Sequence, residues 1–185
     1  HNNLGNAFKE LGQLEDALKS YSKGLTYNPD YIDLLNNLGV VLNDLGQLDK
    51  AVQSYERAIG IKPDYAEAYN NLGVTYNKLG QLEDAVHSYE EALTIDPDYA
   101  DAHNNLGVIN SKLGMPDEAR KSIKKAIDLM TKEIAINPDD ADTHNNLGIA
   151  FFEIEYFEDS ILSYKKALDI KPNFAAGHNN IGAVL

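Results

Sequence analysis

The sequence predicts an all-α solenoid built from stacked helix-turn-helix repeats, and two observations carry this prediction. The tetrapeptide Asn-Asn-Leu-Gly, with Ile for Leu in its last copy, begins at residues 2, 36, 70, 104, 145 and 179, so its copies lie 34, 34, 34, 41 and 34 residues apart. A fixed period of this length is typical of arrays in which each repeat is one supersecondary unit. Small residues, large packing residues and prolines recur in register with the tetrapeptide: Ala17, Ala51, Ala85, Ala119 and Ser160; Tyr21, Tyr55, Tyr89, Ile123 and Tyr164; Pro29, Pro63, Pro97, Pro138 and Pro172.

Each period predicts a first helix, here called helix A. In the third repeat this helix is expected over Ala66–Leu79, because apolar residues at every fourth position share one face. Asp64, followed three residues later by Glu67, predicts an acidic capping box at the helix start. Gly80 is expected to end the helix in a left-handed conformation.

A second helix, helix B, is expected over Leu82–Ile95 of the same repeat, and Pro97 stops it because proline has no backbone N–H to donate. Gly73 lies inside helix A, where glycine costs about 1 kcal/mol relative to alanine. Its recurrence in every repeat predicts a close approach between helices. The recurring tyrosines are expected in the core.

The fourth repeat carries seven extra residues between Ala126 and Pro138. Seven residues add about 700° of helical rotation, close to two full turns, so an apolar face can continue along the same side of the helix. The segment 127–136 contains no Gly or Pro. We therefore expect a longer helix B whose apolar face runs through Ile123, Ile127, Met130 and Ile134.

The repeats predict one continuous array over residues 1–185. Its expected divisions are a partial repeat over 1–31, full repeats over 32–65 and 66–99, the inserted repeat over 100–140, a full repeat over 141–174 and a partial helix A over 175–185.

Composition excludes several classes of function. With 16 basic and 29 acidic residues the net charge is −13, which argues against binding a nucleic-acid backbone or an anionic membrane surface. Seventeen of the 29 acids lie just before or within the first turns of predicted helices, where the helix dipole favours them. There is no cysteine, and hydrophobic residues make up 43% of the chain. The compartment stays open, with a soluble, cytoplasmic protein slightly favoured.

The whole chain resembles the tetratricopeptide repeat (TPR) family, whose 34-residue pattern places Leu-Gly, Tyr, Ala, Phe or Tyr, Ala and Pro at the positions described above. The resemblance implies a right-handed superhelix in which helices A line a concave groove. The second asparagine of each pair matches the asparagine ladder of the TPR superhelix of O-linked N-acetylglucosamine transferases and of bacterial TPR arrays. In that ladder the amides hold the backbone of an extended peptide.

The asparagine pairs are the candidate binding residues. A side-chain amide offers two donors and an acceptor oxygen, which suits a peptide backbone whatever its side chains. Hydrogen bonds between neighbouring repeats are the alternative role for these amides, and the sequence leaves both open. The groove residues are Asn3, Asn37, Asn71, Asn105, Asn146 and Asn180, together with Asn36, Asn70, Asn104 and Asn145.

A groove that clamps a free carboxylate is disfavoured, because acids occupy the positions where such TPR domains carry Lys or Arg. A peptide carboxylate would meet repulsion there. These acids are Asp33, Glu67, Asp101 and Asp142.

Neither a metal, a cofactor nor catalysis is predicted. Equivalent helices lie too far apart for the histidines before the asparagine pairs, His1, His103, His144 and His178, to converge on one ion. His87 is expected to be exposed. The sequence contains no phosphate-binding loop, dinucleotide fingerprint or His-Glu-x-x-His motif.

The fifth repeat departs from the pattern at the turn between its helices. Glu155 replaces the turn glycine, and aromatic residues gather beside it: Phe151, Phe152, Tyr156 and Phe157. This cluster is either an apolar docking patch or a repacked turn, and the repacked turn is the favoured interpretation.

The leading functional prediction is a non-enzymatic scaffold that binds a protein or an extended peptide in the asparagine-lined groove. The alternatives are the substrate-recognition array of a larger glycosyltransferase-type enzyme and a self-assembling, filament-forming element. Self-association is expected through the uncapped C-terminal end, with Ile181, Val184 and Leu185 at the contact.

Overall fold

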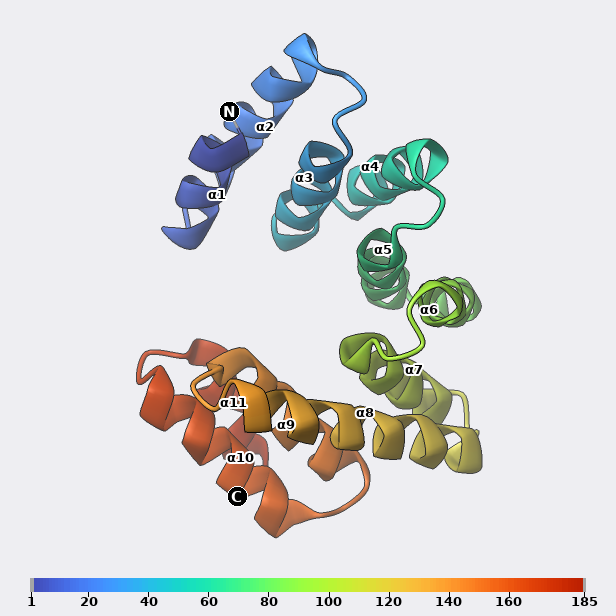
Figure 1. The fold of residues 1–185 in the computed structure, drawn as a ribbon, viewed down its shortest axis with the longest axis vertical. Helices are drawn as coiled ribbons and strands as arrows, with labels where there is room; N and C mark the ends of the chain where they lie inside the picture. The colour runs from blue at the N-terminus through green and yellow to red at the C-terminus, as the bar shows by residue number, and fades with distance from the viewer. Residues whose placement is uncertain (1, 185) are drawn as a thin grey trace. The chain divides into compact units, whose positions relative to one another are not determined.

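The computed structural model describes residues 2–184, and within them the chain forms eleven α-helices and no strand (Figure 1). The chain divides into two compact units, residues 1–97 and 98–185. His1 and Leu185 lie outside the described residues.

The first unit consists of three helix pairs in which each helix packs against the next along the chain (Figure 1). The odd-numbered helices are helices A and the even-numbered ones are helices B. Helices A of neighbouring repeats also touch: α1 contacts α3, and α3 contacts α5. The helices are α1 (Asn2–Glu10), α2 (Leu14–Tyr27), α3 (Ile32–Asp44), α4 (Leu48–Ile61), α5 (Ala66–Leu79) and α6 (Leu82–Ile95).

The second unit contains two complete pairs and one further helix A, with contacts between successive helices and between α7 and α9. Its helices are α7 (Ala100–Lys112), α8 (Pro116–Ile136), α9 (Ala141–Glu153), α10 (Phe157–Ile170) and α11 (Ala175–Val184).

The expected helices of the third repeat are confirmed, since α5 and α6 have the predicted bounds. Gly80 ends α5 with φ of 77°. The predicted capping box at Asp64 is wrong. Tyr65 is the N-cap and makes no side-chain cap, while the Glu67 carboxylate accepts a hydrogen bond from Asn36 in the preceding repeat. A side-chain cap forms at α9 instead, where Asp140 accepts bonds from two backbone N–H groups.

The recurring tyrosines lie in the core, as predicted, and explain the glycine inside each helix A. Tyr89 is 1% exposed. A Cβ atom added at Gly73 would lie 2.6 Å from Cε1 of this ring. The glycine therefore admits the tyrosine of helix B. Gly107 plays the same part opposite Ile123.

The seven extra residues of the fourth repeat continue its helix B, as predicted. Helix α8 has 21 residues, whereas α2, α4, α6 and α10 each have 14. Met130, inside the extension, is 1% exposed and packs with Ala126 and Leu147. The continuing apolar face therefore packs on α9.

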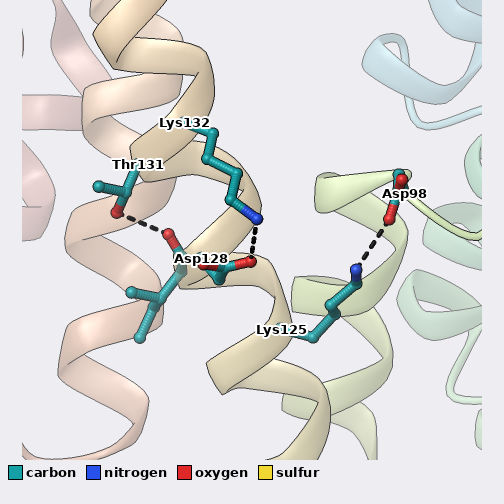
Figure 2. A network of polar contacts seen from close by, with 6 residues as sticks. Asp98, Lys125, Asp128, Thr131 and Lys132 are labelled. Atoms are coloured by element: carbon teal, nitrogen blue, oxygen red, sulfur yellow. Dashed lines mark hydrogen bonds and ion pairs between the residues drawn. The ribbon is translucent and has the colours of Figure 1, made fainter.

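The outer face of α8 is polar. Figure 2 shows Lys132 paired with Asp128 one turn earlier, at 2.7 Å, and Lys125 paired at 2.8 Å with Asp98, which precedes α7. Thr131 donates its hydroxyl to the backbone carbonyl of Ile127. These contacts are exposed and screened by solvent, so we expect them to contribute little to stability.

Candidate functional site

The two asparagines of each pair occupy different depths on helix A. The first asparagines, Asn36, Asn70, Asn104 and Asn145, are 1% to 6% exposed. The second asparagines, Asn37, Asn71, Asn105, Asn146 and Asn180, are half-buried, and Asn3 is exposed. The second asparagine of each pair is therefore the more accessible of the two.

In the first unit the pairs join neighbouring repeats in a regular pattern. Asn71 donates from Nδ2 to Oδ1 of Asn36 at 3.1 Å, and Asn37 donates in the same way to Asn2 at 3.1 Å. Asn36 in turn donates to Oε1 of Glu67 at 2.9 Å. The amides thus form a ladder between repeats, which is the role that the sequence left open beside peptide binding.

The ladder changes register in the second unit at the inserted repeat. Asn180 donates to Asn145 at 3.0 Å, as the pattern requires. Asn146, however, donates to Oδ1 of Asp101 at 2.9 Å, three residues before Asn104. The Oδ1 atom of Asn104 is buried and has no hydrogen-bond partner among the described residues. At the repeat with the long α8, the acceptor on α7 therefore lies three residues before the one that the regular pattern uses.

Asp101 receives this bond in an unfavourable electrostatic setting. Burial raises the pKa of its carboxyl group above the ordinary value of 3.8, and the negative charges of Asp140 and Asp142 raise it further. The hydrogen bond from Asn146 opposes both effects, because it stabilises the charged form. Burial and the charges of Asp101 and Asp140 also raise the pKa of Glu133.

The ladder leaves one acceptor open on four of the second asparagines. Among residues 2–184, no group donates a hydrogen bond to the Oδ1 atom of Asn37, Asn71, Asn146 or Asn180. Because Nδ2 is held by the neighbouring repeat, rotation of the amide is restricted. Each of these side chains can accept one N–H donor from outside.

Acidic side chains accompany this row of acceptors. Asp33 and Glu67 are exposed and lie four residues before Asn37 and Asn71, which puts each acid on the same helix face as its asparagine. The face therefore combines amide acceptors with negative charge.

Two of the histidines that precede the asparagine pairs contact the backbone. His144 and His178 each place Nε2 within hydrogen-bond distance of a proline carbonyl before helix A, at 3.0 Å from Pro138 and 2.8 Å from Pro172. In the described part of the chain, no group of three or more His, Cys, Asp or Glu side chains could hold a metal ion. His87 is exposed on α6, as expected, and His1 lies outside the described residues.

Two hollows lie between helices B of the first unit. One, of about 480 Å³, lies between α2 and α4 over α3, and the other, of about 440 Å³, lies between α4 and α6 over α5. The first is lined mainly by Leu18, Leu25, Leu38 and Leu42, with Lys50 and Arg57 beside them.

The C-terminal helix has an open face. Ile181 and Val184 are half-buried, and the predicted contact residue Leu185 lies outside the described residues. No atom of the described residues would lie within 4 Å of a Cβ atom at Gly182, outside its own helix surroundings, whereas the equivalent Gly148 receives Tyr164. No helix of the described residues is long and apolar enough to cross a membrane.

The chain consists of helix pairs that repeat every 34 residues and are joined by turns that contain glycine. Within the pairs, a tyrosine of helix B packs on a glycine of helix A. These features define a helical repeat protein. The family models described as TPR repeat and tetratricopeptide repeat match residues 5–46, 41–80 and 75–114, and residues 98–173, respectively. The chain belongs to the tetratricopeptide repeat family, and its fold is the all-α solenoid of that family. No curated protein matches it in sequence.

Solved TPR structures share this fold. The thermophilic TPR protein TTC0263 of Thermus thermophilus is 23% identical with a TM-score of 0.79, over 99% of this chain and 96% of that one. YrrB, a TPR protein with an unusual peptide-binding site, is 22% identical with a TM-score of 0.59, over 96% and 88%. The first TPR of Spaghetti (RPAP3), bound to the HSP90 peptide SRMEEVD, is 26% identical with a TM-score of 0.60, over 61% and 90%.

Proposed function

We propose that the protein is an interaction scaffold that binds an extended peptide along the second asparagines of its helices A. The observation that carries the proposal is the open Oδ1 acceptor of Asn37 and Asn71, whose Nδ2 groups are held by the preceding repeat. A backbone N–H is the donor that every peptide segment supplies. The interaction is therefore independent of most ligand side chains.

The spacing of helices A suits an extended chain. Helices α3 and α5 are in contact, and packed helices have axes about 8–10 Å apart. A peptide in the extended polyproline II conformation advances about 3.1 Å per residue and turns once in three residues, so about three residues span one repeat and every third N–H faces the same side. One backbone N–H in three would meet an asparagine.

The charge of the face selects the ligand. Asp33 and Glu67 lie beside the acceptors, so Lys or Arg side chains on the peptide gain charge-assisted bonds and acidic side chains meet repulsion. The peptide bound by the RPAP3 domain, SRMEEVD, carries two adjacent glutamates. We therefore expect this protein to prefer a neutral or basic segment over that acidic one.

Peptide binding by TPR proteins of the same fold supports a role as a scaffold. YrrB is described as having a peptide-binding site, and the RPAP3 domain was captured with a peptide. For the present chain, the row of second asparagines is the surface that offers recognition of a peptide backbone.

Selection from a displayed random-peptide library, followed by titration of the selected peptide, tests the proposal. Changing Asn37 and Asn71 to Ala should weaken binding by about 1 kcal/mol each, or roughly fivefold per site. Three versions of the peptide are then compared, each methylated at every third backbone nitrogen but starting at a different residue. In one of these three registers, methylation should weaken binding by a similar amount.

The control is Asn77→Ala, which changes an asparagine near the end of α5 and away from the paired positions. Thermal unfolding of each variant separates binding from folding. The proposal is wrong if the double variant loses stability but keeps its affinity, or if methylation in all three registers has no effect.

Head-to-tail association is a second candidate, favoured by the open face at Gly182. In the other copies of the motif this glycine receives a side chain of helix B, so a helix from another molecule could pack there. Ile181, Val184 and Leu185 would lie at that contact.

Sedimentation velocity tests this association. Species heavier than 20.4 kDa should form as the concentration rises and should disappear when Ile181, Val184 and Leu185 become Lys. A chain that stays monomeric at high concentration contradicts the second candidate without touching the first.

A further inference from the structure

The turn of the fifth repeat differs from the other turns of the chain in the side chains that it displays. The first three turns read Gly-Gln-Leu, at residues 12–14, 46–48 and 80–82. The fifth reads Glu155-Tyr156-Phe157 and is followed by Glu158 and Asp159. The repeats thus supply internal controls for this one site.

The backbone of this turn nevertheless follows the common path. Glu155 takes φ of 65°, close to the 77° of Gly80, and is the one non-glycine with positive φ among the described residues. The N–H of Tyr156 bonds the carbonyl of Phe151 at 2.8 Å, as the N–H of Gln81 bonds that of Tyr76 at 2.9 Å. The sequence change therefore alters the surface of the turn and not its fold.

The aromatic rings of the turn are ordered in pairs but remain accessible. Phe151 stacks on Tyr156 with ring centroids 6.3 Å apart, and Phe152 meets Phe157 edge to face at 5.7 Å. Tyr156 is 53% exposed and Phe157 is 47% exposed. The cluster is thus a repacked turn, as the sequence favoured, and also an exposed aromatic surface.

A hollow of about 330 Å³ opens on this surface and is lined by Glu155, Tyr156, Phe157, Glu158 and Asp159. No cation of the described residues pairs with these three carboxylates or lies over these two rings. Elsewhere the chain places its own lysines over aromatic rings. Lys62 lies 5.0 Å from the ring centroid of Tyr65, and Lys171 lies 4.8 Å from that of Phe174.

A second hollow, of about 200 Å³, adjoins the first at Glu155 and is lined also by Arg120 and Glu153. Burial raises the pKa of Glu153, although Lys112 partly opposes the shift. A cation that approached Glu155 would also come near this half-buried carboxyl group. Together the two hollows form one surface along the end of α9.

We propose that this turn is a docking site for a Lys- or Arg-bearing segment of a partner protein. The ring faces of Tyr156 and Phe157 take the cation and its apolar stem, and the carboxylates of Glu155, Glu158 and Asp159 neutralise its charge. Charge complementarity selects this occupant, because the three carboxylates beside the two exposed rings attract a cationic side chain and repel an acidic surface. This site and the asparagine face consist of different residues, so the test of one proposal does not decide the other.

Acids alone do not account for the proposed specificity. The turn of the third repeat carries the same pair of acids, Glu83 and Asp84, at the start of α6, but Gln81 and Leu82 stand where the fifth turn has Tyr156 and Phe157. Binding that depends on this ring pair must therefore distinguish the fifth turn from the third. Glu155 adds a third charge at the fifth turn, so binding that depends only on negative charge must survive Tyr156→Gln/Phe157→Leu, which keeps all three carboxylates.

The test is an NMR titration of the ¹⁵N-labelled 185-residue chain with hexa-arginine, with hexa-glutamate as the negative probe. We expect chemical-shift changes centred on residues 151–159 and much smaller changes at residues 80–84. The variant Glu155→Gly/Tyr156→Gln/Phe157→Leu restores the sequence of the first three turns. It should fold at least as stably as the parent, because it removes a non-glycine from the left-handed region, and the shift changes at residues 151–159 should report at least tenfold weaker binding of hexa-arginine.

The matched control is Glu83→Gln, which removes one negative charge, as the triple variant does, but at the turn that has Gln81 and Leu82 in place of the Tyr-Phe pair. It should bind as the parent does. Equal shift changes at the two turns, or unchanged affinity of the folded triple variant, would overturn the proposal.

Discussion

The asparagine pairs of the first unit and those of the inserted repeat have the same sequence but different partners. In the first unit, Asn71 bonds Asn36, and Asn36 bonds Glu67, so both polar atoms of the buried amide are used. In the second unit, Asn146 bonds Asp101, and the acceptor oxygen of Asn104 is left buried without a partner. Identical motifs therefore take different structural roles when the helix between them changes length.

The change of partner accompanies the extra length of α8, the helix that joins α7 to α9. Its extra residues preserve the direction of the apolar face, so Met130 and Leu147 pack together. The hydrogen bonds between α7 and α9 do not keep the regular pattern, because Asn146 bonds Asp101 and not Asn104. Apolar packing is less directional than hydrogen bonding and therefore tolerates the longer helix better.

Glycine substitutions should have the largest effect and should show that apolar packing is alike in the two units. A Cβ atom at Gly73 would lie 2.6 Å from Tyr89, and one at Gly148 would lie 2.5 Å from Tyr164. Each change to Ala should lower the free energy of unfolding by about 2 kcal/mol, through overpacking. Chemical denaturation provides the measurement.

Gly182→Ala is the matched control, because the added methyl group meets no atom outside its own helix surroundings. It should be neutral or stabilising by up to about 1 kcal/mol, since alanine favours the helix. If Gly148→Ala lost little stability and Gly73→Ala lost much, the two units would differ in their apolar packing rather than in the hydrogen bonds of the ladder.

Removal of the buried asparagines should have the next largest effect and should separate the two units. Asn36→Ala breaks two hydrogen bonds between repeats and should cost about 2 kcal/mol. Asn104→Ala removes an acceptor that already has no partner, so its cost should be below about 1 kcal/mol. Equal losses in the two variants, measured by urea unfolding, would argue against the shifted register.

A smaller, pH-dependent effect is expected at Asp101. Its folded pKa lies above the ordinary 3.8, so the folded state holds the proton more tightly than the unfolded state does. Stability from this group is therefore greatest at low pH and declines as the pH rises from about 3.8 through the raised folded pKa. Asp101→Asn stays neutral and keeps an oxygen for Asn146, so its advantage over the parent should grow across that range and then level off. An unchanging difference between pH 4 and pH 7 would contradict this assignment.

Much of the fold follows from the sequence, because period, glycine and proline act locally. The bounds of α5 and α6, the left-handed turn at Gly80 and the length of α8 could all be predicted. The capping box at Asp64 could not, because Glu67 is used by a neighbouring repeat that local spacing does not reveal.

Only part of the candidate site could be predicted from the sequence. The asparagine positions were visible, but whether each amide bonds a neighbour depends on depth and on helix register, which are properties of the packed structure. The seven-residue insertion signalled a change at the fourth repeat. Its consequence, the bond from Asn146 to Asp101, depends on how α9 packs against α7, which no residue pattern specifies.

Double-mutant cycles on Asn146 test the shifted register most directly. Asn146→Ala combined with Asp101→Ala should give a coupling energy of about 1 kcal/mol or more, because the bond involves a carboxylate, and Asn146→Ala combined with Asn104→Ala should give none beyond about 0.3 kcal/mol. The cycle between Asn71 and Asn36 supplies the regular reference, with an expected coupling of about 1 kcal/mol. Coupling of Asn146 to Asn104 at that reference value, with none to Asp101, would show that the ladder runs unbroken through the inserted repeat and would contradict the account.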